Sequence, residues 1–218
     1  ASDVYKRQLR LLVRFADYPE RSIHLTFSQI PADKAARATL VVLHGMRSFG
    51  AWVFADALRG RPMTQETGGF AAFDLNPNIL AAVIATGYEE PSAIQQQSIP
   101  IILAGHDMIG QAQTGTGKTA AFALPILNRI DPAKREPQAL ILAPTRELAL
   151  QVATAFETYA KQMPSVNVVA VYGGAPMGPQ LKAIRNGAQI VVATPGRLCD
   201  HLRRDEKVLA TVNLSLIH

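Results

Sequence analysis

From residue 70 onward, short apolar runs alternate with amphipathic segments. The apolar runs are rich in β-branched residues, and they predict buried strands at 139–143, 166–172 and 189–193. Apolar positions at helical spacing predict helices at 77–86, 92–104, 146–162, 179–186 and 196–204. Strands that alternate with crossover helices form parallel sheets with both faces covered, so we expect an α/β fold.

Residues 1–62 lack this alternation. Residues 39–44 (TLVVLH) predict one strand and residues 49–58 one short helix, too few elements for a core of their own. Met63 opens a polar stretch, residues 63–69, that is typical of the start of a native protein. We therefore expect residues 1–62 to be an irregular leader, translated from upstream sequence.

Composition excludes several classes of protein. With 48% hydrophobic residues the chain can bury a core, and it contains no apolar run of membrane-spanning length. The single cysteine, Cys199, excludes an internal disulfide and a site of several thiolates, and it fits a reducing cytoplasm. The net charge of +5 favours nucleic acid as a partner, but the whole excess lies in residues 1–62 and residues 63–218 are neutral.

The strongest chemical signal is the phosphate-loop pattern at residues 112–119 (AQTGTGKT), which departs from G-x-x-x-x-G-K-[ST] only at Ala112. A short strand at 107–110 precedes it and a helix at 120–130 follows. Glycines let successive backbone N–H groups face one anion, and the start of the helix adds its positive end. Lys118 would reach the β- and γ-phosphates and Thr119 would ligate Mg²⁺, which makes both catalytic candidates. The expected nucleotide contacts are Gln113, Thr114, Gly115, Thr116, Gly117, Lys118, Thr119 and Ala120. The alternative is a Gly/Thr-rich turn in which Lys118 is a surface charge.

Upstream, residues 87–95 (GYEEPSAIQ) place a glutamine on the helix before this loop. The amide of Gln95 can donate and accept together, which matches the N6 and N7 edge of adenine. Guanine presents an acceptor where adenine presents a donor, so this contact would select ATP. Because Gln95 begins a run of three glutamines, the alternative is an ordinary surface amide.

Three further motifs follow predicted strands: residues 144–149 (PTRELA), 173–174 (GG) and 194–197 (TPGR). Thr145 can cap a helix and leave N–H groups and Arg146 for a phosphodiester. The glycine pair would allow a nucleic-acid strand to approach the backbone closely. The alternatives are a capped helix with solvated charges and a plain turn. Because the carboxyl ends of parallel strands share one edge of a sheet, we expect these loops to lie together.

With these motifs in this order, residues 70–211 resemble the DEAD-box ATP-dependent RNA helicases, closest to the bacterial cold-shock type. The resemblance rests on FAAFDL, GYEEPSAIQ, AQTGTGKT, PTRELA, YGG and TPGRL. It implies a RecA-like P-loop NTPase fold, with a Q-motif region at 70–98 and a partial ATP-binding domain at 99–213. It also implies ATP and Mg²⁺ as ligands and RNA as partner, held by its backbone with little sequence specificity.

The resemblance also implies which residues contact each ligand. The expected base pocket consists of Phe70, Tyr88, Pro91 and Gln95, with the ring of Phe70 stacked on the adenine. Phe73 competes with Phe70 for that role, and core packing is the alternative for both rings. The expected RNA contacts are Pro144, Thr145, Arg146, Glu147, Gly173, Gly174, Thr194, Pro195, Gly196 and Arg197.

The carboxylates of the family's Asp-Glu-Ala-Asp motif, which hold Mg²⁺ and position water, are expected on the strand after the TPGR helix. The sequence there, residues 212–218, is VNLSLIH, and Asp205 and Glu206 come too early to substitute. We expect residues 214–218 to be a truncated or foreign tail. The chain is therefore expected to bind adenine nucleotide weakly without hydrolysing ATP, and a full-length parent would add a second RecA-like domain.

Other functions remain open at this point. The chain could be a nucleotide- or RNA-binding module without catalysis. Another P-loop ATPase or a DNA helicase would share Lys118 and Thr119 but not the pair Gln95 and Phe70. Residues 40–52 resemble the start of an α/β-hydrolase oxyanion loop, but no G-x-S-x-G motif follows. Cys199, His106 and His201 are expected in ordinary core or surface roles, because they are too few and scattered for a metal site.

Overall fold

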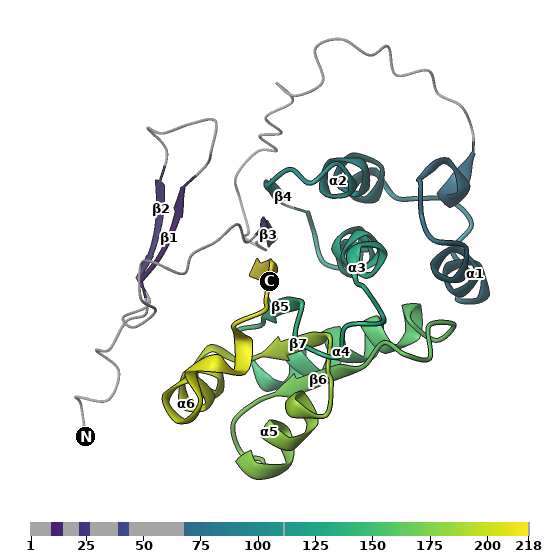
Figure 1. Cartoon of the computed structure of the whole chain (residues 1–218). Coiled ribbons are helices and arrows are strands. Elements are labelled where there is room, and N and C mark those ends of the chain that lie inside the picture. The colour runs from purple at the N-terminus through teal and green to yellow at the C-terminus, as the bar shows by residue number, and fades with distance from the viewer. Residues whose placement is uncertain (1–9, 15–21, 27–38, 44–67, 111, 218) are drawn as a thin grey trace.

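The computed structural model describes residues 10–14, 22–26, 39–43, 68–110 and 112–217. Within them, six parallel strands form one sheet in the order β4-β3-β8-β5-β7-β6 (Figure 1). The strands are β3 (Thr39–Leu43), β4 (Met108–Gly110), β5 (Ala139–Leu142), β6 (Val168–Val171), β7 (Ile190–Ala193) and β8 (Leu214–Ile217). This confirms the α/β fold with a parallel sheet.

The helices lie close to their predicted ranges. They are α1 (Pro77–Ala85), α2 (Ala93–Leu103), α3 (Lys118–Arg129), α4 (Arg146–Tyr159), α5 (Met177–Arg185) and α6 (Pro195–Arg204). Short 3₁₀ helices span Gly69–Ala72 (η2) and Glu206–Leu209 (η3). The largest difference is at the end of α4, which stops three residues before the predicted position 162. The chain turns at 160–162, ahead of Pro164, and a residue before proline disfavours helical backbone.

Helices cover the sheet on both faces, as Figure 1 shows for α2 and α3 against α5 and α6. Successive side chains of a strand point to opposite faces. Ile141, Val192 and Leu216 therefore pack in one core with residues of α1 to α4. Leu142 and Val191 face the other way, into a smaller core with residues of α5, α6 and η3.

Part of the region before Met63 belongs to this sheet. The predicted strand at 39–44 is confirmed as β3, which pairs with β4 on one side and β8 on the other. Residues 214–217, assigned above to a tail, form β8 in the same sheet. Two further strands, β1 (Arg10–Arg14) and β2 (Ser22–Thr26), form a separate antiparallel pair. The predicted helix at 49–58 lies outside the described residues.

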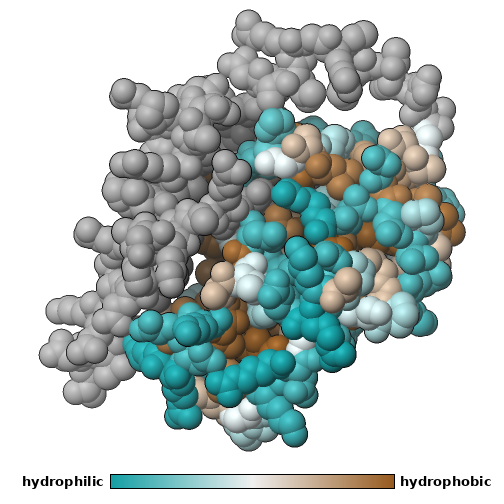
Figure 2. All heavy atoms as spheres, in the orientation of Figure 1, coloured by the Kyte–Doolittle hydropathy of each residue, from teal (hydrophilic) through white to brown (hydrophobic). Residues whose placement is uncertain are grey.

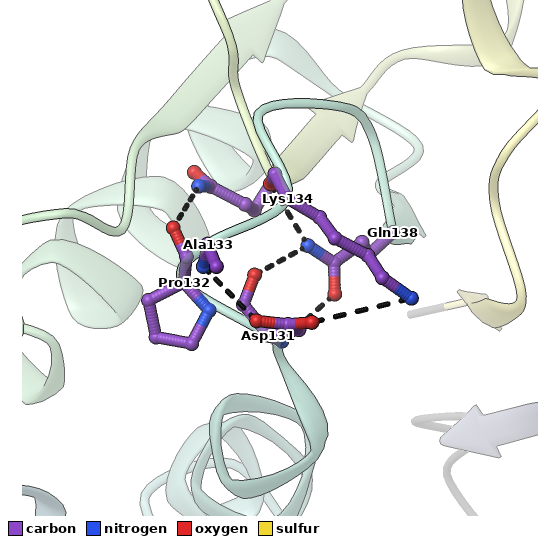
Figure 3. Close-up of polar contacts among 6 residues, drawn as sticks. Asp131, Pro132, Ala133, Lys134 and Gln138 are labelled. Atoms are coloured by element: carbon purple, nitrogen blue, oxygen red, sulfur yellow. Dashed lines mark hydrogen bonds and ion pairs between the residues drawn. The ribbon is translucent and has the colours of Figure 1, made fainter.

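A buried glutamine fixes the loop that leads into β5 (Figure 3). The Nε2 of Gln138 donates to the carbonyls of Asp131 at 2.8 Å and Lys134 at 3.1 Å, and its Oε1 accepts from the Asp131 N–H at 2.8 Å. Gln189, fully buried before β7, similarly bonds the backbone of Ser165 and Asn167. A buried polar atom costs free energy unless it is hydrogen-bonded, so the folded chain must keep these backbone groups beside the two amides. Gln138 and Gln189 thereby fix where β5 and β7 begin.

The described surface is mixed in character. On the face drawn in Figure 2, hydrophilic residues predominate over α6, whereas apolar residues reach the surface in the region of α1 and α2. Within residues 68–110 and 112–217, Ile84 in α1 is the most exposed large apolar residue, at 63%. No helix among the described residues combines the length and the apolar character needed to span a membrane.

Candidate nucleotide site and nucleic-acid interface

The four motif loops all follow the carboxyl ends of strands in the parallel sheet. The phosphate loop follows β4, PTREL follows β5, the glycine pair follows β6, and TPGR follows β7. Ligands of open α/β sheets bind at this edge. β4 lies at one end of the sheet, while β5, β7 and β6 are neighbours at the other end. The edge therefore has a phosphate-loop part and a part built from three loops.

The phosphate loop curls through two glycines in the left-handed region. Gly115 has φ 83° and Gly117 has φ 81°, conformations that side-chain-bearing residues rarely adopt. Gly117 caps α3, so the free N–H groups at the start of that 12-residue helix open toward the loop. A Cβ added to Gly117 would lie 2.3 Å from Nε2 of Gln95, so a larger residue there would displace that amide.

Lys118 lies inside the loop. Its side chain is 9% exposed, and its Nζ donates to the carbonyl of Ala112 at 2.5 Å. Within the loop, the hydroxyl of Thr116 donates to the carbonyl of Gln113 at 2.8 Å. The half-buried Thr119 follows Lys118 in the first turn of α3. N–H groups, an ammonium group and a hydroxyl at one site fit the oxygens of a phosphate chain and its Mg²⁺.

Gln95 is not a surface amide, since it is 1% exposed. Its Oε1 accepts from the N–H of Ser92 at 2.8 Å, and its Nε2 donates to the carbonyl of Gly117 at 3.1 Å. A primary amide has two N–H groups and two lone pairs, so one of each is left for the adenine edge. Gln95 thus ties the start of α2 directly to the phosphate loop.

Ser92, which is not among the predicted site residues, makes a second hydrogen bond to the phosphate loop. Its hydroxyl donates to the carbonyl of Thr116 at 2.8 Å. The sequence signal for it is the Ser-x-x-Gln capping box that Ser92 forms with Gln95 at the start of α2. Beside these two hydrogen bonds lies a cavity of about 230 Å³. It is lined by Tyr88, Glu90, Ser92, Gln95, Gly115, Thr116 and Gly117.

The aromatic residues beside this cavity form a packed group. The ring of Phe70 is 3% exposed and meets Tyr88 and Phe73 edge-on, with centroids 5.7 and 6.0 Å away. Stacking of Phe70 on adenine stays a prediction. Tyr88 is half-buried and lines the cavity, and its hydroxyl lies 3.3 Å from that of Tyr159 at the end of α4. Pro91 is buried.

At the other part of the edge, the PTREL and glycine loops adjoin. Thr145 caps α4 as predicted, accepting from the N–H of Leu148 at 3.2 Å. The exposed guanidinium of Arg146 lies 4.8 Å above the ring of Tyr172. A Cβ on Gly174 would lie 3.5 Å from Nη1 of Arg146. Tyr172, which precedes the glycine pair, is not among the predicted contacts, although an aromatic residue beside a strand-end glycine pair could have indicated it.

The TPGR loop joins the same group through Arg197, whose Nη1 donates to the carbonyl of Ala175 at 2.7 Å. Four N–H groups of this guanidinium are left for other acceptors. The remaining predicted contacts are exposed (Pro144, Glu147, Gly173 and Gly196) or half-buried (Thr194 and Pro195). The structure therefore brings the three predicted loops into one continuous surface.

The fold and these loops define a P-loop α/β protein, and residues 92–217 match the DEAD/DEAH box helicase family. Because the match covers more than half of the chain, the chain belongs to that family. This confirms the DEAD-box resemblance and gives the α/β-hydrolase alternative no support.

Curated relatives agree with the match. The ATP-dependent RNA helicase DeaD of Klebsiella pneumoniae is 59% identical over 135 residues, which is 62% of this chain and 21% of that protein. DeaD of Mycobacterium tuberculosis H37Rv is 52% identical over 148 residues, 68% of this chain and 25% of that protein. The chain thus spans about a quarter or less of these relatives.

A solved structure confirms the RecA-like fold. The DEAD box protein of the hyperthermophile Methanococcus jannaschii is 39% identical, with a TM-score of 0.65. The similarity covers 68% of this chain and 40% of that one.

Proposed function

We propose that the chain is the ATP-binding part of an ATP-dependent RNA helicase, which binds ATP with Mg²⁺ at one part of the sheet edge and RNA at the other. The hydrogen bond from Gln95 to Gly117 is the observation that carries the nucleotide assignment. The amide of Gln95 therefore lies beside the phosphate loop, and both line one cavity. A loop that bound phosphate alone would have no need of this arrangement.

Each nucleotide-site residue has a distinct role in this proposal. Lys118 and the first N–H groups of α3 bind the β- and γ-phosphates, and the Thr119 hydroxyl binds Mg²⁺. The remaining N–H and lone pair of Gln95 pair with N7 and N6 of adenine. Tyr88 and Pro91 form the wall of the base pocket.

The RNA site consists of individually placed hydrogen-bond donors rather than of a strongly basic surface. Arg146, Arg197 and the N–H groups at the starts of α4 and α6 bind phosphodiester oxygens, and Gly173 and Gly174 let the strand come close. Such contacts read the backbone, so we expect little sequence preference. The preference for RNA over DNA is supported by the curated relatives, which are named RNA helicases. Contacts to ribose 2′-hydroxyls would supply it.

The whole protein would couple ATP hydrolysis to unwinding of RNA duplexes, with a second RecA-like domain closing on the first. For residues 1–218 we propose nucleotide binding without turnover, because these residues contain no Asp-Glu-Ala-Asp motif. We further propose a cytoplasmic location, supported by the single free cysteine.

Binding and hydrolysis measured separately test these proposals. A fluorescent ATP analogue with Mg²⁺ should bind the chain, and Gln95→Ala should weaken ATP while abolishing its advantage over GTP. Gln97→Ala, in an exposed amide of the same helix, is the matched control and should change neither affinity. Equal affinity for ATP and GTP in the unaltered chain would contradict the base-pocket assignment. Phosphate release above that of Lys118→Ala would contradict binding without turnover.

A further inference from the structure

A buried polar pair joins α6 to α5 beneath the surface that the PTREL, glycine and TPGR loops form. His201, on α6, has no exposed area, and its Nε2 lies 3.3 Å from Oε1 of Gln180 on α5. Gln180 is 8% exposed, and its Nε2 donates to the carbonyl of Tyr172 at 3.0 Å. Since that donor is committed to Tyr172, the amide presents its oxygen to the imidazole. This assigns the proton of neutral His201 to Nε2, which donates to Gln180.

Tyr172 connects this pair to the exposed arginines. Its carbonyl accepts from Gln180, and its ring lies under the guanidinium of Arg146. On α6, Arg197 lies one helical turn before His201 and donates to Ala175, three residues beyond Tyr172. One series of contacts thus runs from Arg146 through Tyr172 and Gln180 to His201 on α6. A second contact, from Arg197 on the same helix, returns to the glycine loop.

We propose that Gln180 and His201 are positioning residues for the RNA-backbone site. They hold α6 against the end of β6, so that Arg146 and Arg197 face the same stretch of phosphodiesters. Both are too buried to touch RNA themselves, and their effect would pass through Tyr172 and Arg197. This inference rests on the proposed RNA function and extends it to two residues outside the predicted motifs.

The glycine loop after Tyr172 is an exposed turn. Gly173 and Gly174 are exposed, and Gly174 has φ 82°. The bond from the half-buried Arg197 to Ala175 joins α6 to this loop only through a long, flexible side chain. Two guanidinium groups that bind one backbone must keep a fixed separation, and small misplacements weaken such paired contacts. Gln180 and His201 keep the guanidinium groups of Arg146 and Arg197 at that fixed separation.

The test compares RNA affinity with nucleotide affinity in the 218-residue chain. Gln180→Met and His201→Phe remove the hydrogen bonds while keeping similar volume. Each should weaken binding of a fluorescent oligouridylate by about fivefold, the effect of one hydrogen bond. Affinity for the fluorescent ATP analogue should stay within about twofold, because the phosphate loop lies at the other end of the sheet edge. His201→Gln, whose Nε2 can reach the position of the imidazole Nε2, should restore RNA affinity.

A double-variant cycle separates positioning from general stability. If His201 acts through Arg197, the pair Arg197→Ala and His201→Phe should bind RNA no more weakly than Arg197→Ala alone. Additive losses, a parallel fall of RNA and ATP affinity, or no rescue by His201→Gln would overturn the inference. An unaltered chain that binds ATP but not RNA would instead overturn the proposed RNA function itself. A missing thermal unfolding transition would mean that His201→Phe does not fold. The cycle is then made with Gln180→Met in place of His201→Phe, and its result decides.

Discussion

The ammonium group of Lys118 lies 2.5 Å from the carbonyl oxygen of Ala112, so this lysine bridges the two ends of its own phosphate loop. The contact keeps a 9%-exposed charge paired within the protein. A phosphate entering the loop would offer the same ammonium group a stronger, charged partner. The lysine is thus held where an incoming nucleotide can reach it.

Lys118→Ala should reduce affinity for the fluorescent ATP analogue about 10- to 100-fold, since hydrogen bonds to charged groups contribute about 1.5–3 kcal/mol. RNA affinity should stay unchanged. Lys161→Ala, just beyond α4, removes the same charge from an exposed position and serves as the control. Equal losses in both variants would mean that net charge, and not the loop, governs binding.

Gly117→Ala and Gly115→Ala form a matched pair for the tie between Gln95 and the phosphate loop. Both glycines have positive φ, so each alanine should cost about 1–2 kcal/mol of unfolding free energy. At Gly115 a Cβ meets nothing within 4 Å, whereas at Gly117 it collides with the amide of Gln95. Gly117→Ala should therefore be the less stable variant in urea denaturation without nucleotide. Equal stabilities would show that Gln95 does not pack against Gly117.

The hydroxyl contact between Tyr88 and Tyr159 gives the stability a dependence on alkaline pH. Burial and the Tyr88 hydroxyl raise the pKa of Tyr159 above its ordinary value of 10.0. The folded state therefore retains the proton longer than the unfolded state, and this contribution is fully present below pH 10 and lost as the pH rises above it. Urea denaturation from pH 8 to 11 should show the decline. It should be shallower in Tyr159→Phe, and an identical decline would refute the assignment.

His201 gives a second dependence, at acidic pH. Burial, followed by the charges of Arg197 and Arg204, lowers its pKa from 6.5, while Asp200 opposes the shift. Its Nδ1 is the one buried side-chain polar atom of the described residues without a hydrogen-bond partner, so a proton there would be unpaired. Because the folded pKa is depressed, stability is fully present above about pH 6.5 and falls as the pH drops below it. His201→Gln should flatten the curve between pH 5 and 7.5, and an unchanged slope would assign the loss to other groups.

Local patterns in the sequence predicted much of the fold and the motif loops. Strands such as β7 and helices such as α4 follow from apolar spacing, and the phosphate loop follows from residues adjacent in the chain. Contacts between distant segments gave no such signal. Gln180 and His201 meet only when α5 packs beside α6, and a single helical histidine is indistinguishable from an ordinary core residue. The place of β3 between β4 and β8 likewise depends on pairing across more than 60 residues.

The division of the sheet edge into a nucleotide part and an RNA part is most directly tested by residue-resolved NMR of the amides during two separate titrations. Mg²⁺ with a non-hydrolysable ATP analogue should shift the amides of Gly115, Gly117 and Lys118. Oligouridylate should shift those of Arg146, Gly174 and Arg197 and leave the phosphate loop unchanged. A second cavity, lined among others by Arg185, Asp205 and Lys207, lies outside both parts of this edge. Shifts by both ligands at the same loop, or by either ligand only at that second cavity, would contradict the division.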